Sequence, residues 1–390
     1  MVKKYYNIDD LRKAAKKQLP KGLFEFIDRG VEDEIALKES VSAFRDIKLL
    51  PRPMIDVSKR QAAANLFGRP AAMPLVVAPT GAAGLCWYEG ELALAKAAAK
   101  FGIPFTLATA SMTDMKRVSA VLPEGGFWFQ LYMYAEKELS FELVRRAQQA
   151  GAAALLVTVD QTALPNREYM YRNGFGVPFK LTPAALAEIA THPRWLFGVL
   201  SRYLATSGMP KNRNYPTGYQ RSILSDPKKN VGMANDTITW DDIKRIRSVW
   251  PGKLLVKGIL RPEDAVRCVG IGVDGVVVST HGGRTFDSAI PSILALPGIA
   301  NAVKGKCTIL LDSGIRRGSD IFKAVAFGAD GVLTGRATLY GVAADGAAGA
   351  ERALEILNQE FLNTMAHAGC NAVSDISADL IHASTITNTI

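Results

Sequence analysis

The sequence of 390 residues contains few cysteines, few histidines and no long apolar run. Its four cysteines lie far apart and form no CxxC pair, which excludes a disulfide framework and a zinc site of regular ligand spacing. No run of about eighteen apolar residues is present, and residues 1–20 contain no apolar core of a signal peptide. We therefore expect a cytoplasmic protein with no metal site.

Acidic residues are outnumbered, because 37 Asp and Glu stand against 47 Lys and Arg, a formal charge of +10. Most of this excess lies in residues 161–238, where ten Lys or Arg accompany four Asp or Glu. A basic protein can bind nucleic acid, an anionic membrane or an acidic substrate. The charge is concentrated in one segment, with little aromatic interleaving elsewhere, so we predict no nucleic-acid partner.

After Pro74, short apolar or β-branched runs alternate with amphipathic helical stretches. Eight strands alternating with helices are typical of a closed parallel barrel, so we predict an α/β protein with a (β/α)8 TIM barrel. An open doubly wound sheet is the alternative, but no GxGxxG turn follows the first strand. The predicted strands are residues 75–78, 105–108, 128–131, 155–159, 254–257, 275–279, 308–311 and 332–334. Predicted helices include residues 91–101, 141–150, 240–250, 262–269 and 321–327, and a long final one from about residue 351.

Two segments lie outside this alternation within what we expect to be one barrel domain of residues 1–390. Residues 1–70 are predicted to form an N-terminal cap, which is helical over 5–45. Residues 161–238 form an insertion after the fourth strand, too long for an ordinary βα loop and therefore expected to be functional or partly mobile. Its apolar stretch 195–203 is either a solvated flap or an interfacial segment, in which case residues 181–230 associate with an anionic membrane surface.

Polar side chains follow the predicted strands at their carboxyl ends, which meet at one face of a barrel. His281 is the only one of four histidines between a strand and a Gly-Gly turn, so it is the candidate general base. Asp160 can hold its tautomer, Arg284 offers a planar fork for a carboxylate, and Lys257 can stabilise a developing anion. Together these residue types predict proton abstraction from an anionic substrate.

Glycine-rich turns follow the seventh and eighth predicted strands, at residues 312–318 and 335–336. Glycines let backbone N–H groups approach an anion at the start of a helix, and Arg316 or Arg336 can clamp it. The loops after these two strands are the usual phosphate site of the fold. We predict a bound phosphate, which belongs either to a cofactor or to a phosphorylated substrate.

At these positions the chain resembles the FMN-dependent 2-hydroxy-acid dehydrogenases and oxidases, a family that includes glycolate oxidase, L-lactate dehydrogenase and (S)-mandelate dehydrogenase. The resemblance extends from about residue 6 to about residue 381. It is carried by Trp-Phe-Gln-Leu-Tyr at 128–132, Ser-Thr-His-Gly-Gly-Arg at 279–284, residues 312–320 and Gly-Arg-Ala at 335–337. Residues 19–21 and 335–341 resemble most the quinone-linked members, such as mandelate dehydrogenase.

The resemblance implies FMN as cofactor and the oxidation of an (S)-2-hydroxy acid, mandelate- or lactate-like, to the 2-oxo acid. It also implies a quinone or other electron acceptor, a homotetramer, and a place in the cytoplasm or at the inner face of the cell membrane. The implied catalytic residues are His281, Asp160, Tyr132 and Lys257, and the implied substrate contacts are Arg284, Arg167, Tyr132 and Phe26. The implied FMN contacts are Pro79, Thr80, Gly81, Ala108, Gln130, Thr158, Lys257, Ser279, Asp312, Ser313, Gly314, Arg316, Gly335 and Arg336.

Three positions depart from the family pattern: Phe26 stands in place of a carboxylate-binding tyrosine, Ala108 in place of a serine and Thr280 in place of an asparagine. Gly81 favours a dehydrogenase, because oxidases of the family commonly carry alanine there. The alternatives are an oxidase that forms hydrogen peroxide and a flavin-binding protein with an altered or impaired substrate site.

Overall fold

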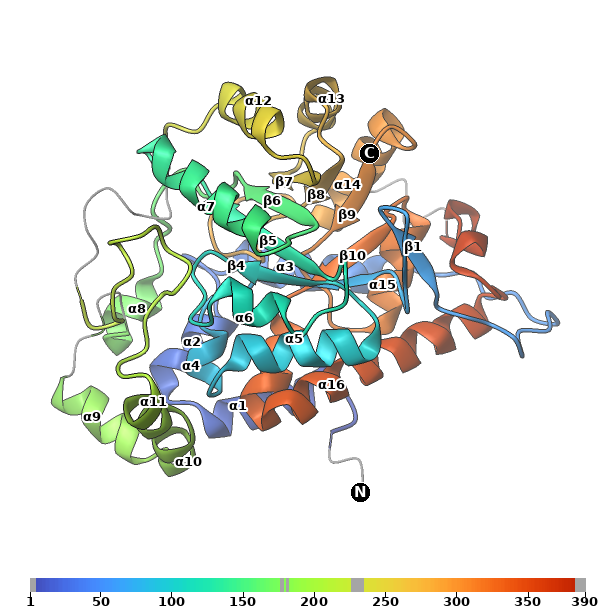
Figure 1. Cartoon of the computed structure of the whole chain (residues 1–390). Helices are drawn as coiled ribbons and strands as arrows, with labels where there is room; N and C mark the ends of the chain where they lie inside the picture. Colours follow the sequence, from blue (N-terminus) through green and yellow to red (C-terminus); the bar gives the residue numbers. More distant parts are fainter. Residues whose placement is uncertain (1–4, 176–178, 180–181, 226–234, 383–390) are drawn as a thin grey trace.

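Eight parallel strands close into a barrel in the computed structural model, which describes residues 5–175, 179, 182–225 and 235–382 (Figure 1). Around the barrel their order is β10-β3-β4-β5-β6-β7-β8-β9. The predicted TIM barrel is confirmed, and each predicted strand agrees with an observed one to within two residues at either end. The strands are β3 (Leu75–Val77), β4 (Phe105–Ala108), β5 (Phe127–Tyr132), β6 (Ala154–Thr158), β7 (Lys253–Ile259), β8 (Gly275–Val278), β9 (Thr308–Leu311) and β10 (Gly331–Thr334).

Alternate side chains of these strands fill the barrel, as the period of two requires. Trp128, Leu156 and Leu255 belong to one buried interior cluster. A short antiparallel hairpin of β1 (Ala64–Leu66) and β2 (Arg69–Ala71) adds Leu66 and Ala71 to it. Neither strand of this hairpin contains a β-branched or aromatic residue, and the hairpin was not predicted.

Helices cover the outside of the barrel and connect successive strands (Figure 1). The longest, α16, begins at Arg336, well before the predicted start near residue 351, and bends at Asp345 and Gly346. A Cβ on Gly346 would lie 2.6 Å from the ring of Trp87, so glycine permits this close approach. The covering helices are α4 (Ala83–Cys86), α5 (Gly90–Phe101), α6 (Met115–Ser119), α7 (Lys137–Gln149), α12 (Trp240–Val249), α13 (Pro262–Ile271), α14 (Ser292–Val303), α15 (Gly318–Ala326) and α16 (Arg336–His367).

The predicted N-terminal helical segment forms three helices, α1 (Ile8–Gln18), α2 (Lys21–Asp28) and α3 (Ile35–Asp46). Asn7 caps α1 by accepting a hydrogen bond of 2.8 Å from the backbone N–H of Asp10. The last carbonyls of α2 have no partner within the helix, and they lie next to the carboxyl ends of the strands. At the other end of the chain lie two 3-10 turns, Val373–Asp375 and Ala378–Leu380.

The described part of the insertion contains α8 (Glu168–Asn173), α9 (Pro183–Ala190), α10 (Pro193–Trp195), a π-helical turn (Leu196–Leu200) and α11 (Ser201–Thr206). The group from α9 to α11 projects from the barrel at the lower left of Figure 1. Trp195 and Tyr203 of the predicted interfacial stretch are buried, whereas Phe197 is 69% exposed. Residues 181 and 226–230 of the predicted membrane segment lie outside the described residues. No helix in the described ranges is long and apolar enough to cross a membrane.

Candidate active site

A cavity of about 640 Å³ lies at the carboxyl ends of the barrel strands. Its volume is within the range of roughly 300–1,000 Å³ that is usual for cofactor and substrate sites. The predicted site residues that line it are Phe26, Pro79, Thr80, Gly81, Ala108, Gln130, Tyr132, Thr158, Arg167, Lys257, His281, Arg284, Asp312, Ser313, Gly314, Arg316, Gly335 and Arg336. Two further predicted residues, Asp160 and Ser279, are not part of this lining and lie behind Lys257 and His281.

Strand register explains why the central side chains meet. Tyr132 is paired with Thr158, which is paired with Lys257 on the next strand, so these three residues lie at one level of the barrel. After Lys257 the register of β7 shifts and Gly258 adopts a φ of +112°. A Cβ on Gly258 would lie 2.6 Å from the Cβ of Asp160, so glycine allows the Asp160 side chain to approach the centre.

His281 is held between a carboxylate and a phenol. Its Nδ1 lies 2.7 Å from Oδ1 of Asp160, and the hydroxyl of Tyr132 lies 3.3 Å from its Nε2. His281 has a left-handed φ of +54°, a conformation that costs a non-glycine residue free energy and is found most often at functional sites. Its backbone N–H donates to Oγ of Ser279 at 3.0 Å, which holds this turn. Nδ1 therefore carries the proton shared with Asp160, and the lone pair of Nε2 faces the cavity.

The electrostatics of this pair favour a neutral histidine beside an ionised aspartate. Burial lowers the pKa of His281 below its ordinary value, against the opposing charge of Asp160. Burial raises the pKa of Asp160, but its interaction with His281, which includes a hydrogen bond, and the charge of Lys257 outweigh burial and hold that pKa below its ordinary value. Burial also raises the pKa of Tyr132 to about 12, so its phenol stays protonated. His281 is thus ready to accept a proton and Tyr132 to donate a hydrogen bond.

Lys257 lies among three acceptors. Its Nζ donates to Oγ of Ser279 at 2.8 Å and lies 3.2 Å from Oδ2 of Asp312 and 3.9 Å from Oδ2 of Asp160. Burial lowers the pKa of Lys257, but Asp312 and Asp160 outweigh it and the pKa lies above its ordinary value. Lys257 therefore keeps its charge at the cavity wall. Ser279, a predicted flavin contact, is buried, and its hydroxyl accepts from both Lys257 Nζ and the backbone N–H of His281, so it also orients these two residues.

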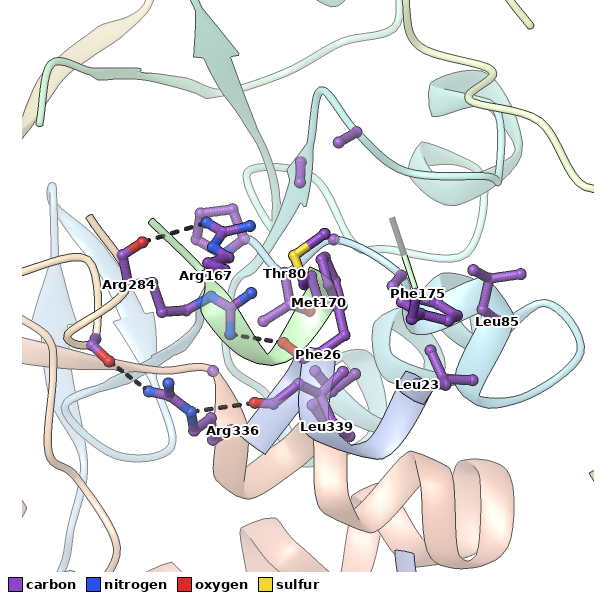
Figure 2. Close-up of a pocket in the computed structure, with 18 of the residues that line it drawn as sticks. Leu23, Phe26, Thr80, Leu85, Arg167, Met170, Phe175, Arg284, Arg336 and Leu339 are labelled. Carbon is purple, nitrogen blue, oxygen red and sulfur yellow. Dashed lines mark hydrogen bonds between the residues drawn. The ribbon is translucent and has the colours of Figure 1, made fainter. Parts of the chain in front are cut away.

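The guanidinium groups of two arginines lie near the ring of Phe26 (Figure 2). The Cζ atom of Arg284 lies 5.0 Å from the ring centroid, and that of Arg167 lies 5.9 Å from it. Arg284 Nη1 donates to the carbonyls of Phe26 at 2.6 Å and Arg29 at 2.9 Å, near the end of α2. Arg167 Nη2 donates to the carbonyl of Arg284 at 3.3 Å, while its buried Nε has no partner. Burial and the charge of Arg284 lower the pKa of Arg167 to about 10. Within the described ranges neither guanidinium has a carboxylate within 4.0 Å. A bound anion would therefore compensate the positive charges of both arginines.

Arg336 occupies the predicted phosphate end of the cavity and is buried. It donates to the carbonyls of Ile27 at 3.1 Å, Gly282 at 2.8 Å and Arg29 at 3.1 Å (Figure 2). These bonds join α2 to the turn that carries His281, a role that the sequence did not reveal. Burial lowers the pKa of Arg336 to about 10, which means that its charge is incompletely compensated. A bound anion at this end would supply the missing compensation.

Gly314 borders the same end in a left-handed conformation with a φ of +89°. A Cβ there would lie 1.9 Å from the carbonyl oxygen of Ser40 on α3, so only glycine fits between the cap and the cavity. Arg316 lies at the edge of the cavity, where its Nη1 donates to its neighbour's carbonyl at 2.8 Å. In the part of the chain that the structure describes, no group of three His, Cys, Asp or Glu could hold a metal ion.

Apolar residues that the sequence did not single out line the opposite side of the cavity. Figure 2 shows Leu23, Leu85 and Phe175 there, with Met170 and Phe26 between them and the three arginines. In a sequence such residues look like any other core residue, and they come from three distant segments. No local pattern could have identified them.

The chain is similar to known proteins both in sequence and in overall structure. The family model of the FMN-dependent dehydrogenases matches residues 15–383. The chain is 37% identical to an (S)-mandelate dehydrogenase of Pseudomonas putida, over 100% of this chain and 97% of that protein. It is 39% identical to a putative L-lactate dehydrogenase of Mycobacterium tuberculosis, over 95% of this chain and 87% of that protein. The crystal structure of the monotopic membrane protein (S)-mandelate dehydrogenase superposes with a TM-score of 0.88 at 35% identity, covering 97% and 99% of the two chains.

Proposed function

The chain belongs to the FMN-dependent dehydrogenase family, and on that premise we propose which of its residues oxidise a 2-hydroxy acid to the 2-oxo acid. FMN is the cofactor. One observation supports the assignment above all others: His281 lies between Asp160 and Tyr132 on the cavity that holds the arginines without a carboxylate partner. A neutral imidazole that can accept a proton at Nε2, next to an anion site, is what the abstraction of a proton from a hydroxy acid requires.

The residues of the cavity fit FMN. Arg336, buried and incompletely compensated, and the close-packed turn at Gly314 suit the phosphate. Gln130, Thr158 and Lys257 line the wall where the ring system would lie. When bound, FMN supplies the acceptor for the two electrons that leave the substrate carbon. Lys257 would stabilise the negative charge that this transfer creates.

The remaining work falls to the side chains around the substrate. Arg284 and Arg167 would bind its carboxylate, which places its hydroxyl near His281 and Tyr132. Nε2 of His281 would take the hydroxyl proton, and Asp160 would stabilise the imidazolium that forms. The protonated phenol of Tyr132 would donate a hydrogen bond to the substrate oxygen.

The test is anaerobic mixing of the FMN-loaded protein with glycolate, lactate and mandelate. At least one of them is expected to bleach the yellow flavin, and His281→Gln is expected to keep FMN but lose bleaching. If no hydroxy acid bleached a fully loaded protein, the assignment would be wrong and a flavin-binding protein with an impaired site would be favoured. Rapid oxygen consumption during turnover would instead indicate an oxidase.

A second observation favours a peripheral membrane protein. Leu186, Phe197 and Leu204, on α9, the π-helical turn and α11, are 52%, 69% and 51% exposed. Exposed Arg194 and Arg202 lie close to them in the chain. Apolar side chains edged by basic ones suit the surface of an anionic bilayer. The chain also superposes on a monotopic membrane protein.

We therefore infer that this projection attaches the enzyme to the membrane, where the electron acceptor is a quinone. Flotation with anionic vesicles at low and high salt tests the attachment. Phe197→Ser should weaken it, and Phe286→Ser, at a site that is 63% exposed outside the insertion, should not. Absence of flotation at low salt would rule the attachment out.

A further inference from the structure

The cavity has a second, apolar part beyond the residues assigned to FMN and substrate. We call it the apolar arm and define it by Leu23, Leu85, Phe175, Ile189 and Trp195, all of which line the cavity. All of them except Phe175 are buried. Phe175 connects the two parts, because its ring centroid lies 5.8 Å from that of Phe26.

The insertion forms one wall of the apolar arm and also the exposed projection. Ile189 of α9 lines the arm, whereas Leu186 on the same helix is exposed. Likewise Trp195 lines the arm, and Phe197 two residues later faces outward.

Two hydrogen bonds hold this wall against the rest of the molecule. Trp195 Nε1 donates to the carbonyl of Leu85 at 2.6 Å, and the backbone N–H of Lys21 donates to Oε1 of Glu188 at 2.8 Å. The arm therefore lies directly behind the surface on which the membrane attachment would depend.

A small anionic substrate would not be bound by the apolar arm. Its carboxylate is attracted to Arg167 and Arg284, and burial of a charge among apolar side chains without a partner is strongly unfavourable. Apolar walls suit a ligand with a large hydrophobic surface, and they gain free energy in proportion to the apolar area that is buried. Tyr215 and Tyr219, on the same cavity, carry hydroxyls of the kind that quinone oxygens bind.

We propose that the apolar arm binds a lipid-soluble quinone, which enters from the membrane beside the α9–α11 projection and reoxidises the enzyme. This rests on the proposed function, since it assumes that a hydroxy acid reduces the bound FMN. In the complete reaction the hydroxy acid loses two electrons and two protons as one C–H and one O–H bond break. The quinone gains both electrons and both protons and leaves as the quinol, so atoms and electrons balance.

Leu85→Trp, which fills the arm, tests the proposal, with Leu50→Trp as a matched control at an exposed position outside both the cavity and the α9–α11 projection. Each FMN-loaded protein is reduced anaerobically with the best substrate and then reoxidised by a short-chain ubiquinone analogue or by ferricyanide. In Leu85→Trp, reoxidation by the quinone should slow by about tenfold or more, since a ring cannot enter an overpacked site. Reduction by substrate and reoxidation by ferricyanide should remain close to those of the control.

Binding is measured separately by quenching of tryptophan fluorescence, without turnover. The quinone should quench the parent protein, and Trp195→Phe should lose most of that quenching. When the parent protein is assayed with quinone analogues of increasing alkyl chain length, KM should fall about fourfold for each methylene of the quinone that becomes buried. If Leu85→Trp does not fold, Leu23→Gln replaces it, with Leu50→Gln as its control.

Equal quinone reoxidation in the arm variant and its control, together with quenching that does not depend on Trp195, would overturn the proposal. The proposed function fails in a different way, when no hydroxy acid reduces the flavin in any of these proteins. The two failures are therefore distinguishable in a single series of measurements.

Discussion

Phe26→Tyr adds one hydroxyl at the position where the family resemblance implies a carboxylate-binding tyrosine. The ring of Phe26 lies below the guanidinium groups of Arg284 and Arg167, at 5.0 Å and 5.9 Å from their Cζ atoms. A phenol here would add a third donor to the proposed carboxylate site. The ring changes little in volume, and a tyrosine face attracts cations about as well as a phenylalanine face. The packing of the two arginines should therefore survive the substitution.

The expected gain follows from the hydrogen bond alone. A hydrogen bond to a charged acceptor contributes about 1.5–3 kcal/mol, which corresponds to roughly a tenfold to 150-fold change in affinity. The carboxylate is bound equally in the ground state and the transition state, so KM should fall while kcat stays nearly constant. The contact with Phe175, whose ring centroid is 5.8 Å from that of Phe26, restricts how far the new phenol can turn away.

Steady-state kinetics on glycolate, lactate and mandelate measure the effect, with Phe197→Tyr as the control because that exposed ring lies outside the cavity. KM for at least the two small substrates should fall in Phe26→Tyr and stay unchanged in the control. An unchanged or raised KM for all three acids would refute the idea that the missing hydroxyl limits this site. A raised KM for mandelate alone would instead assign Phe26 to the apolar pocket for the substrate side chain.

Three further predictions follow from the same geometry. His281→Gln should slow flavin reduction by roughly 10²–10⁴-fold or more without loss of FMN, as followed by stopped-flow absorbance; a rate near that of the parent would mean that another group is the base. The pKa of His281 lies below its ordinary value of 6.5, so kcat/KM should stay constant near neutral pH and fall only as His281 is protonated at lower pH; a fall that begins above pH 7 would contradict this. Gly314→Ala should lower the melting temperature and the FMN affinity by more than the control Gly305→Ala. Both glycines have a positive φ, but only a Cβ at position 314 would collide with Ser40. Equal losses in the two variants would show that the contact with the cap does not matter.

The sequence by itself determined the barrel and most of the residues on its active face. Strand length, alternation and turn residues are local properties, and a parallel barrel brings all carboxyl strand ends to one face. Side chains alternate between the two faces of a strand. This alternation was sufficient to place Gln130 and Tyr132 on the same face of one strand, and Thr158 and Asp160 on the same face at the end of the next. The motifs around His281 and Gly314 then indicated the family without any knowledge of three-dimensional contacts.

Only the tertiary structure decided how these residues are supported and what lies around them. Arg336 is held by a carbonyl of α2, about three hundred positions away in the chain, and Ser279 accepts a hydrogen bond from Lys257. The stretch predicted to be interfacial is divided, with Trp195 turned inward to Leu85 and Phe197 outward. Such contacts depend on how separate elements pack against one another, and the free energy of packing is not encoded in the spacing of neighbouring residues. For the same reason the apolar arm, built from distant segments, could be found only once those segments were in place.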